Sequence, residues 1–161
     1  MLDKIAQFLI NNKLTISTAE SCTGGLVSSM LTDISGSSEY TKLNFVTYAN
    51  EAKHSVLGVL EETLENFGAV SEECAREMAA GLQKVTGADI ALCTTGVAGP
   101  TGGTKEKPVG LCYISCRFNG QTAVKKLLLD SNIERKKMKQ LFAQEAINFA
   151  YETITKEAFE R

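Results

Sequence analysis

The feature that most constrains the fold is the mainly apolar run Asp89 to Thr95, which ends in a glycine-rich segment, Gly96 to Gly110. Such an unbroken run is typical of a strand buried on both faces of a sheet. A strand of this kind needs helices on both sides of the sheet. The sequence therefore predicts an α/β fold in which a buried strand leads into a long loop, and long loops in compact domains are usually functional.

The flanking segments alternate between helical and strand patterns. We expect a helix ending near Asn11, a strand over Leu14–Ala19, a helix over Leu26–Ile34, a strand over Leu43–Tyr48, a helix starting at Asn50 or Glu51, a helix capped by Ser71 and ending near Lys84, a hairpin of Gly110–Phe118 and Gln121–Leu129 around Asn119-Gly120, and a closing helix, continuous or broken, over Ile133–Phe159. Together they predict a single three-layer α/β/α domain over residues 1–161. Its sheet is mixed and mainly parallel, and its C-terminal β-hairpin precedes the closing helix.

Charge and composition narrow the classes of partner. The 161 residues carry 17 Lys and Arg against 19 Asp and Glu, a net charge of −2, so no basic field predicts binding to nucleic acid or an anionic membrane. Neither a signal peptide nor an apolar run of membrane-spanning length is recognisable. Five scattered cysteines and one histidine predict neither a disulfide framework nor a metal site. We expect a cytoplasmic protein with a small-molecule partner.

The first candidate site is the segment Thr18 to Gly25, which reads TAESCTGG and joins a strand to a helix. Open α/β sheets usually bind ligands at this position. Ser21 can act there as a nucleophile, while backbone N–H groups near Thr23 to Gly25 hold an oxyanion or phosphate. Alternatively, Ser21 and Thr23 only cap the helix. Cys22 is a weaker nucleophile candidate, because the single histidine limits a Cys–His pair, and a buried structural thiol fits it better.

The second candidate is Lys53, which lies one helical turn after Tyr48 at the end of a predicted strand. No convincing Ser–His–Asp set is present, so a Ser–Lys mechanism is the economical hypothesis. Desolvation can lower the pKa of a lysine from about 10.4 toward neutrality and turn it into a base for Ser21. The commoner alternatives are a solvated Lys53 and a Tyr48 that packs in the core.

Two further segments could bind polar groups of a ligand. The glycines and hydroxyls of the segment Thr94 to Thr104 can form a phosphate cradle or an oxyanion hole from backbone N–H groups, although the segment lacks the spacing of known phosphate-binding motifs. Arg135 opens the basic cluster RKKMK and could contact a substrate phosphate. A flexible loop and a solvated helix face are the respective alternatives.

Taken in order, the motifs TAESCTGG, VTYANEAK, GAVSEE and TGVAGPTGGTKEKPVG closely resemble the nicotinamide-nucleotide amidohydrolase family, that is, the CinA carboxy-terminal domain family of competence- or damage-inducible proteins. The resemblance runs from about Leu14 through the closing helix. It implies a stand-alone form of this domain that hydrolyses nicotinamide mononucleotide to nicotinate mononucleotide and ammonia, without metal or organic cofactor. It also makes a homodimer plausible.

The resemblance also implies roles for individual residues. Ser21 would attack the carboxamide, Lys53 would act as base, and Tyr48 would support the proton transfer. The residues expected to bind substrate are Glu20, Thr23, Gly24, Gly25, Thr95, Gly96, Gly99, Gly102, Gly103 and Arg135.

Several positions depart from the family pattern. They are Asn44, Thr101, Lys105, the segment Ile133-Glu134-Arg135, and Lys139, which stands where a second arginine is common. A lysine lacks the planar fork of arginine, so these changes bear on substrate fit and phosphate affinity. Two alternatives therefore stay open: a hydrolase of a different amide, and a non-catalytic domain that binds a nucleotide or a partner protein.

Overall fold

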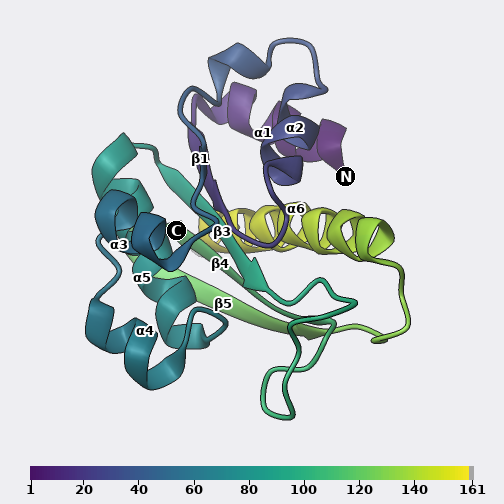
Figure 1. Ribbon diagram of the computed structural model, residues 1–161. Coiled ribbons are helices and arrows are strands. Elements are labelled where there is room, and N and C mark those ends of the chain that lie inside the picture. The colour runs from purple at the N-terminus through teal and green to yellow at the C-terminus, as the bar shows by residue number, and fades with distance from the viewer. Residues whose placement is uncertain (160–161) are drawn as a thin grey trace.

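The computed structural model describes residues 1–159, and Figure 1 shows a central sheet with helices on both faces. Glu160 and Arg161, which belong to the predicted domain, lie outside the described residues. The five strands follow the order β2-β1-β3-β4-β5 across the sheet. They are β1 (Ile16–Glu20), β2 (Phe45–Val46), β3 (Ile90–Gly96), β4 (Leu111–Phe118) and β5 (Gln121–Leu128). β1 pairs in parallel with β2 and β3, whereas β4 is antiparallel to β3 and β5, which confirms the mixed, mainly parallel sheet.

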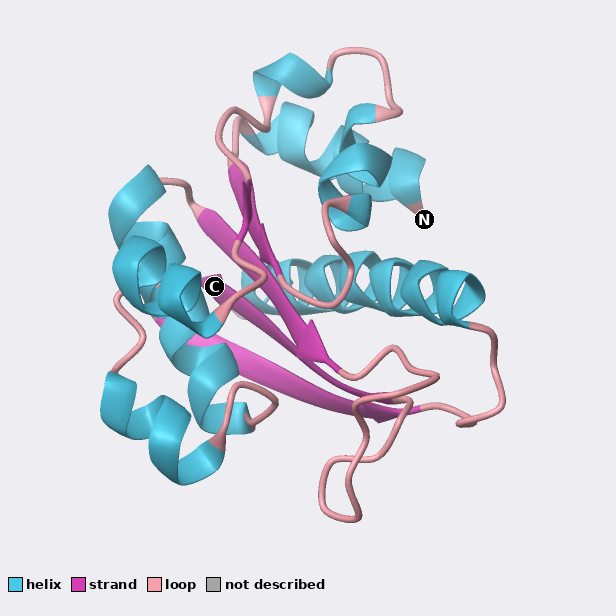
Figure 2. Ribbon diagram, in the orientation of Figure 1, coloured by secondary structure: helices cyan, strands magenta, loops and turns pink. Residues whose placement is uncertain are grey.

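The helices form two layers, one on each face of the sheet (Figure 2). One layer holds α1 (Leu2–Asn12), α2 (Leu26–Thr32) and α6 (Arg135–Phe159), and the other holds α3 (Asn50–Leu57), α4 (Glu61–Phe67) and α5 (Glu72–Thr86). A short 3₁₀ turn, η1 (Ser37–Glu39), follows α2. Alternate residues of β3 enter the two cores: Ile90 and Leu92 pack on the α6 side, and Ala91 and Cys93 on the α5 side. The prediction that this strand is buried on both faces is confirmed.

The structure shows the conformation of two predicted features of the C-terminal part, the hairpin turn and the closing helix. Asn119 and Gly120 have φ values of 52° and 78°, as the predicted turn between β4 and β5 requires. The closing helix α6 is a single unbroken helix of 25 residues.

The second strand is much shorter than the predicted Leu43–Tyr48. At Asn44 the side chain, in place of the backbone, forms the hydrogen bond to β1. Its amide oxygen accepts a hydrogen bond from the N–H of Thr18 on β1 at 2.9 Å, and its amide nitrogen donates to Ser28 Oγ at 2.9 Å. Regular pairing with β1 therefore covers only Phe45 and Val46.

A glycine in α5 lets α3 approach closely. A methyl group at Gly81 would lie 1.7 Å from the carbonyl oxygen of Leu57, the last residue of α3. Glycine inside a helix costs roughly 0.5–1 kcal/mol relative to alanine, and here the absent side chain makes room for the neighbouring backbone. This approach fixes α3, which carries Lys53, against the rest of the layer.

Candidate active site

Ser21 lies directly after β1, in the turn that leads to α2. Its N–H donates to the carbonyl oxygen of Thr94 on β3 at 3.0 Å, so the backbone of this residue stays anchored to the sheet. Gly24 and Gly25 complete the turn with φ values of 61° and 101°, in the left-handed region that favours glycine. The side chain of Ser21 is 8% exposed. The predicted arrangement of strand, tight turn and helix therefore holds Ser21 firmly at the end of a strand.

The carboxylate of Glu20 is fully buried and points toward the start of α2. It accepts hydrogen bonds from the N–H groups of Val27 at 2.8 Å and Ser28 at 3.0 Å, and from Thr23 Oγ1 at 2.6 Å. Thr23 Oγ1 in turn lies 2.8 Å from Thr94 Oγ1 on β3. Glu20 thus satisfies helix donors that would otherwise lack a partner, and it does so from inside the protein.

These contacts lie next to the predicted anion site at the beginning of α2. Besides the donors taken by Glu20, the N–H of Gly24 donates to the carbonyl oxygen of Ser21 at 3.1 Å. Glu20 therefore accepts from N–H groups in the first turn of α2, whereas the predicted anion site consists of the N–H groups near Thr23 to Gly25, of which that of Gly24 already has an acceptor.

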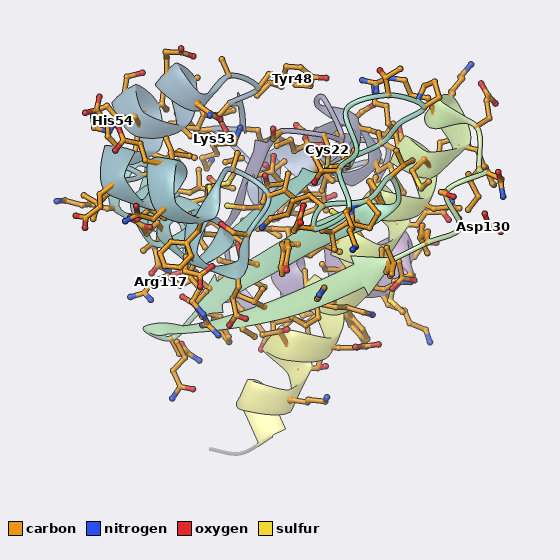
Figure 3. The ribbon with its side chains drawn as sticks, turned by 60° about the horizontal axis from the view of Figure 1, so that its bottom comes forward. Cys22, Tyr48, Lys53, His54, Arg117 and Asp130 are labelled. Atoms are coloured by element: carbon orange, nitrogen blue, oxygen red, sulfur yellow. The ribbon has the colours of Figure 1, made fainter. Side chains whose placement is uncertain are left out.

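Lys53 reaches Ser21 from the first turn of α3. Its side chain is 1% exposed, and its Nζ lies 3.0 Å from Ser21 Oγ. The same nitrogen lies 3.1 Å from the carbonyl oxygens of both Thr47 and Tyr48. Figure 3 shows Lys53 in the same part of the molecule as Tyr48 and Cys22. The structure therefore brings Ser21 and Lys53 together.

Burial lowers the pKa of Lys53, because the ammonium form loses hydration. Nearby thiols oppose this effect, since negative charge on Cys74 or Cys22 would raise the same pKa. A neutral amine has two N–H donors and one lone pair. In the structure Nζ donates to Ser21 Oγ, and Oγ donates to the carbonyl oxygen of Tyr48 at 3.5 Å. Once the amine is neutral, the carbonyl oxygens of Thr47 and Tyr48 can accept its two N–H bonds, and its lone pair can accept the hydroxyl proton of Ser21.

A cavity of about 300 Å³ opens in front of Ser21. Its walls come from the start of α3, the α4–α5 connection, the glycine-rich loop after β3, and the start of α6. The lining residues are Ser21, Cys22, Tyr48, Asn50, Lys53, Ala69, Val70, Thr95, Gly96, Val97, Ala98, Gly99, Thr101, Gly102 and Arg135. We call Ser21 and Lys53 the inner end of this cavity, and Tyr48, Gly99 and Arg135 its rim.

The rim is held by the guanidinium group of Arg135. One of its nitrogens donates to the carbonyl oxygen of Gly99 at 2.6 Å, and another donates to the hydroxyl of Tyr48 at 3.1 Å. The Tyr48 residue is 59% exposed. The backbone carbonyl of Tyr48 therefore contacts Lys53 at the inner end, whereas its hydroxyl contacts Arg135 at the rim.

Some residues that sequence reasoning placed in the site lie outside this cavity. Thr23, Gly24 and Gly25 line a separate depression beside α6, together with Lys136 and Lys139. A methyl group at Gly24 would lie 3.4 Å from Lys139 Nζ. Glu20 is buried behind the turn, and Gly103 packs against Val109. The other predicted positions line the cavity: Ser21, Tyr48, Lys53, Thr95, Gly96, Gly99, Gly102 and Arg135.

The structure also adds a wall that was not among the predicted site residues, formed by Ala69 and Val70. The hydroxyl of Thr95 donates to the carbonyl oxygen of Ala69 at 2.8 Å, and Lys107 Nζ contacts the carbonyl oxygen of Val70. The one available signal was the motif GAVSEE, which contributes to the family resemblance without containing an obvious chemical group.

Among the side chains that the structure describes, no group of three or more His, Cys, Asp or Glu residues could hold a metal ion. Over the same residues, none of the helices is both long and apolar enough to cross a membrane.

Comparisons with known proteins find similarity to one family over most of the chain. The family model described as the CinA C-terminal domain matches residues 1–154. A CinA-like protein of Kosmotoga olearia is 52% identical over 145 residues, which cover 90% of this chain and 35% of that protein. A putative competence-damage inducible protein of Thermoanaerobacter pseudethanolicus is 51% identical over 132 residues, 82% of this chain and 32% of that protein. This chain thus spans about a third of the length of these curated relatives.

Solved structures show the same fold. The competence damage-inducible protein A of Klebsiella pneumoniae superposes with a TM-score of 0.91 at 33% identity, covering 96% of this chain and 94% of that one. The competence/damage inducible protein of Agrobacterium tumefaciens gives a TM-score of 0.89 at 40% identity, covering 92% and 90%.

Proposed function

We propose that this chain, which belongs to the CinA C-terminal domain family, hydrolyses the carboxamide of nicotinamide mononucleotide to nicotinate mononucleotide and ammonia. The observation that carries the proposal is the buried amine of Lys53, 3.0 Å from the hydroxyl of Ser21. A nucleophile and its base within hydrogen-bond reach are the signature of covalent catalysis. The substrate itself follows from the family resemblance.

The proposed reaction has two halves. Neutral Lys53 takes the hydroxyl proton of Ser21 while Oγ attacks the carboxamide carbon, and Lys53 then returns the proton to the nitrogen that leaves as ammonia. In the second half, a water molecule gives a proton to Lys53 and attacks the acyl-serine. The C–Oγ bond then breaks, Lys53 returns the proton to Oγ of Ser21, and the acid leaves. Two carbonyl acceptors keep the amine directed at Ser21 through both halves.

The rim supplies a charge for the other end of the substrate. Arg135 lines the cavity, and its guanidinium group can donate to a phosphate while it still contacts Gly99 and Tyr48. Thr95, Gly96, Gly99 and Gly102 line the same cavity and are proposed to contact polar groups of the nucleotide. No cofactor takes part in the proposed reaction. A cytoplasmic location and a homodimer stay predictions.

The test is ammonia release from nicotinamide mononucleotide by the wild type, by Ser21→Ala, and by the matched control Ser55→Ala, which alters an exposed serine on α3. We expect turnover in the wild type and the control, and its loss in Ser21→Ala. A substrate panel with nicotinamide riboside and other amides addresses the rival hydrolase, which Thr101 in the cavity wall favours. An inactive wild type that binds the nucleotide would support the non-catalytic alternative instead.

The pH dependence tests the role of Lys53 separately. If the neutral amine is the base, kcat/KM rises as the pH increases through the pKa of Lys53 in the free enzyme. Because burial lowers this pKa, the rise should lie below the usual value for lysine of about 10.4. A profile that stays flat from pH 6 to 10, measured by ammonia release in a buffer series, would exclude Lys53 as the titrating base.

A further inference from the structure

We propose that Cys22 and Cys112 form a reversible disulfide when a peroxide enters the cavity, and that this bond disables the site. Their sulfur atoms lie 3.8 Å apart, although the two residues are 90 positions apart in the chain. Cys22 directly follows Ser21, and Cys112 belongs to β4, where it pairs with Gly96 of β3. The pair therefore joins the turn that carries Ser21 to the strand next to the glycine-rich loop.

Access favours Cys22 as the thiol that reacts first. Cys22 lines the cavity, with 4% of its surface exposed, whereas Cys112 is fully buried. Burial also raises the pKa of Cys112, which protects it from external oxidants. A thiol that lines a cavity and lies beside a second, resolving thiol is an arrangement found in redox-sensitive cysteine pairs.

The chemistry needs only a peroxide as oxidant. The sulfur of Cys22 attacks one oxygen of hydrogen peroxide, the O–O bond breaks, and water leaves, which converts Cys22 to a sulfenic acid. The sulfur of Cys112 then attacks the sulfur of Cys22, and the hydroxyl group leaves as water with the proton of the Cys112 thiol. Two thiols lose two electrons in total, and one peroxide becomes two molecules of water.

The bond would disturb the inner end of the cavity. A disulfide requires the sulfur atoms to approach from 3.8 Å to about 2.0 Å, so the two side chains must reorient, and with them the turn after β1 or the start of β4 is pulled from its present position. Ser21 is the direct neighbour of Cys22, and its side chain lies within hydrogen-bond distance of Lys53. Since a displacement of about 1 Å can cost roughly 100-fold in rate, we expect the disulfide to lower turnover by about that factor.

The decisive measurement is mass spectrometry of the whole chain after treatment with hydrogen peroxide and alkylation of the remaining thiols. Before alkylation the oxidised chain should weigh about 2 Da less than the reduced chain, and after alkylation it should carry three alkyl groups instead of five. A thiol reductant should reverse both changes. Tryptic mapping should link the peptide 14–42 to the peptide 106–117. The second peptide also contains Cys116, so fragmentation must assign the bond to Cys112.

Two variants make the assignment specific. Cys112→Ala should not form the 2 Da species, whereas the matched control Cys74→Ala, which removes a buried thiol of the other core, should form it as the wild type does. The proposal is overturned if peroxide leaves the mass unchanged, if Cys22 gains oxygen without forming a bond, or if the bond links other cysteines.

Activity gives a second readout, which rests on the proposed function. Peroxide should inhibit ammonia release by the wild type, and the reductant should restore it. Because the mass measurement needs no substrate, a reduced protein that releases no ammonia but forms the disulfide with peroxide would contradict the proposed function and leave the redox inference standing. The opposite result, a reduced protein that is active but forms no disulfide with peroxide, would contradict only the redox inference.

Discussion

The two ends of the cavity are built in different ways. At the inner end, Lys53 and Ser21 are 1% and 8% exposed, and backbone groups of neighbouring strands and turns hold both residues. At the rim, Tyr48 is 59% exposed, and Arg135 reaches across solvent-facing space to the carbonyl oxygen of Gly99 in the glycine-rich loop. The inner end thus depends on the sheet framework, and the rim depends on loops and one long side chain.

This difference indicates that the inner end and the rim have separate roles. A buried amine loses hydration, and its pKa falls, so the inner end can supply a neutral base. An exposed arginine keeps its charge and its hydration, so the rim can attract an anion but contributes little to the chemical step. Under the proposed function, changes at the inner end should therefore affect kcat, and changes at the rim should affect KM.

The largest effect is expected for Lys53→Met, which removes the amine and keeps a side chain of similar length. We expect kcat for ammonia release to fall by about 10³-fold, in the range that general base catalysis contributes. The free energy of unfolding, measured in urea, should change little, because removal of a desolvated amine offsets the loss of the donor to the carbonyl oxygens of Thr47 and Tyr48. The exposed control Lys84→Met should change neither quantity. Full activity in Lys53→Met would show that the inner end of the cavity does not supply the base.

Glu20→Ala should have the next largest effect, and it should appear as lost stability. It leaves the N–H groups of Val27 and Ser28 without their acceptor, which predicts a loss of about 3 kcal/mol in the free energy of unfolding. Urea denaturation measures this loss, and Glu65→Ala on the exposed surface of α4 is the control. If Glu20→Ala unfolds at the urea concentration of the wild type, the carboxylate does not hold the turn at the inner end.

Much of the framework could be predicted from the sequence, because regular elements follow from short-range patterns. The apolar run Asp89–Thr95, the cap at Ser71 and the pair Asn119-Gly120 each specify their local structure. The predicted second strand was too long, because the side chain of Asn44 forms a contact with β1 that no periodic pattern encodes.

The candidate site, too, could be predicted from the sequence only in part. The motifs indicated Ser21 and Lys53, yet the burial that lowers the pKa of Lys53 arises only when α3 packs against α5 at Gly81. The sequence could not show that Glu20 turns inward to α2, since a carboxylate beside a nucleophile is equally compatible with substrate binding. Long-range packing decides such orientations.

Arg135→Ala tests the rim directly. Loss of a charge-assisted hydrogen bond costs about 1.5–3 kcal/mol, which corresponds to at least a tenfold rise in KM for nicotinamide mononucleotide. We expect kcat to change little, and we expect the KM for nicotinamide riboside, which lacks the phosphate, to stay the same. Lys137→Ala, an exposed cation in the same turn of α6, is the control. An equal rise in KM for both substrates would show that Arg135 does not bind the phosphate.

The smallest effect is expected for Tyr48→Phe, and it decides to which end of the cavity this side chain belongs. Its hydroxyl contacts Arg135, so its removal should raise KM for nicotinamide mononucleotide by about two- to threefold, as the loss of one exposed neutral hydrogen bond would. The backbone carbonyl that holds Lys53 remains, so kcat should stay within about twofold of the wild type. A fall in kcat of tenfold or more, with KM unchanged, would instead place the tyrosine hydroxyl in the proton transfer at the inner end.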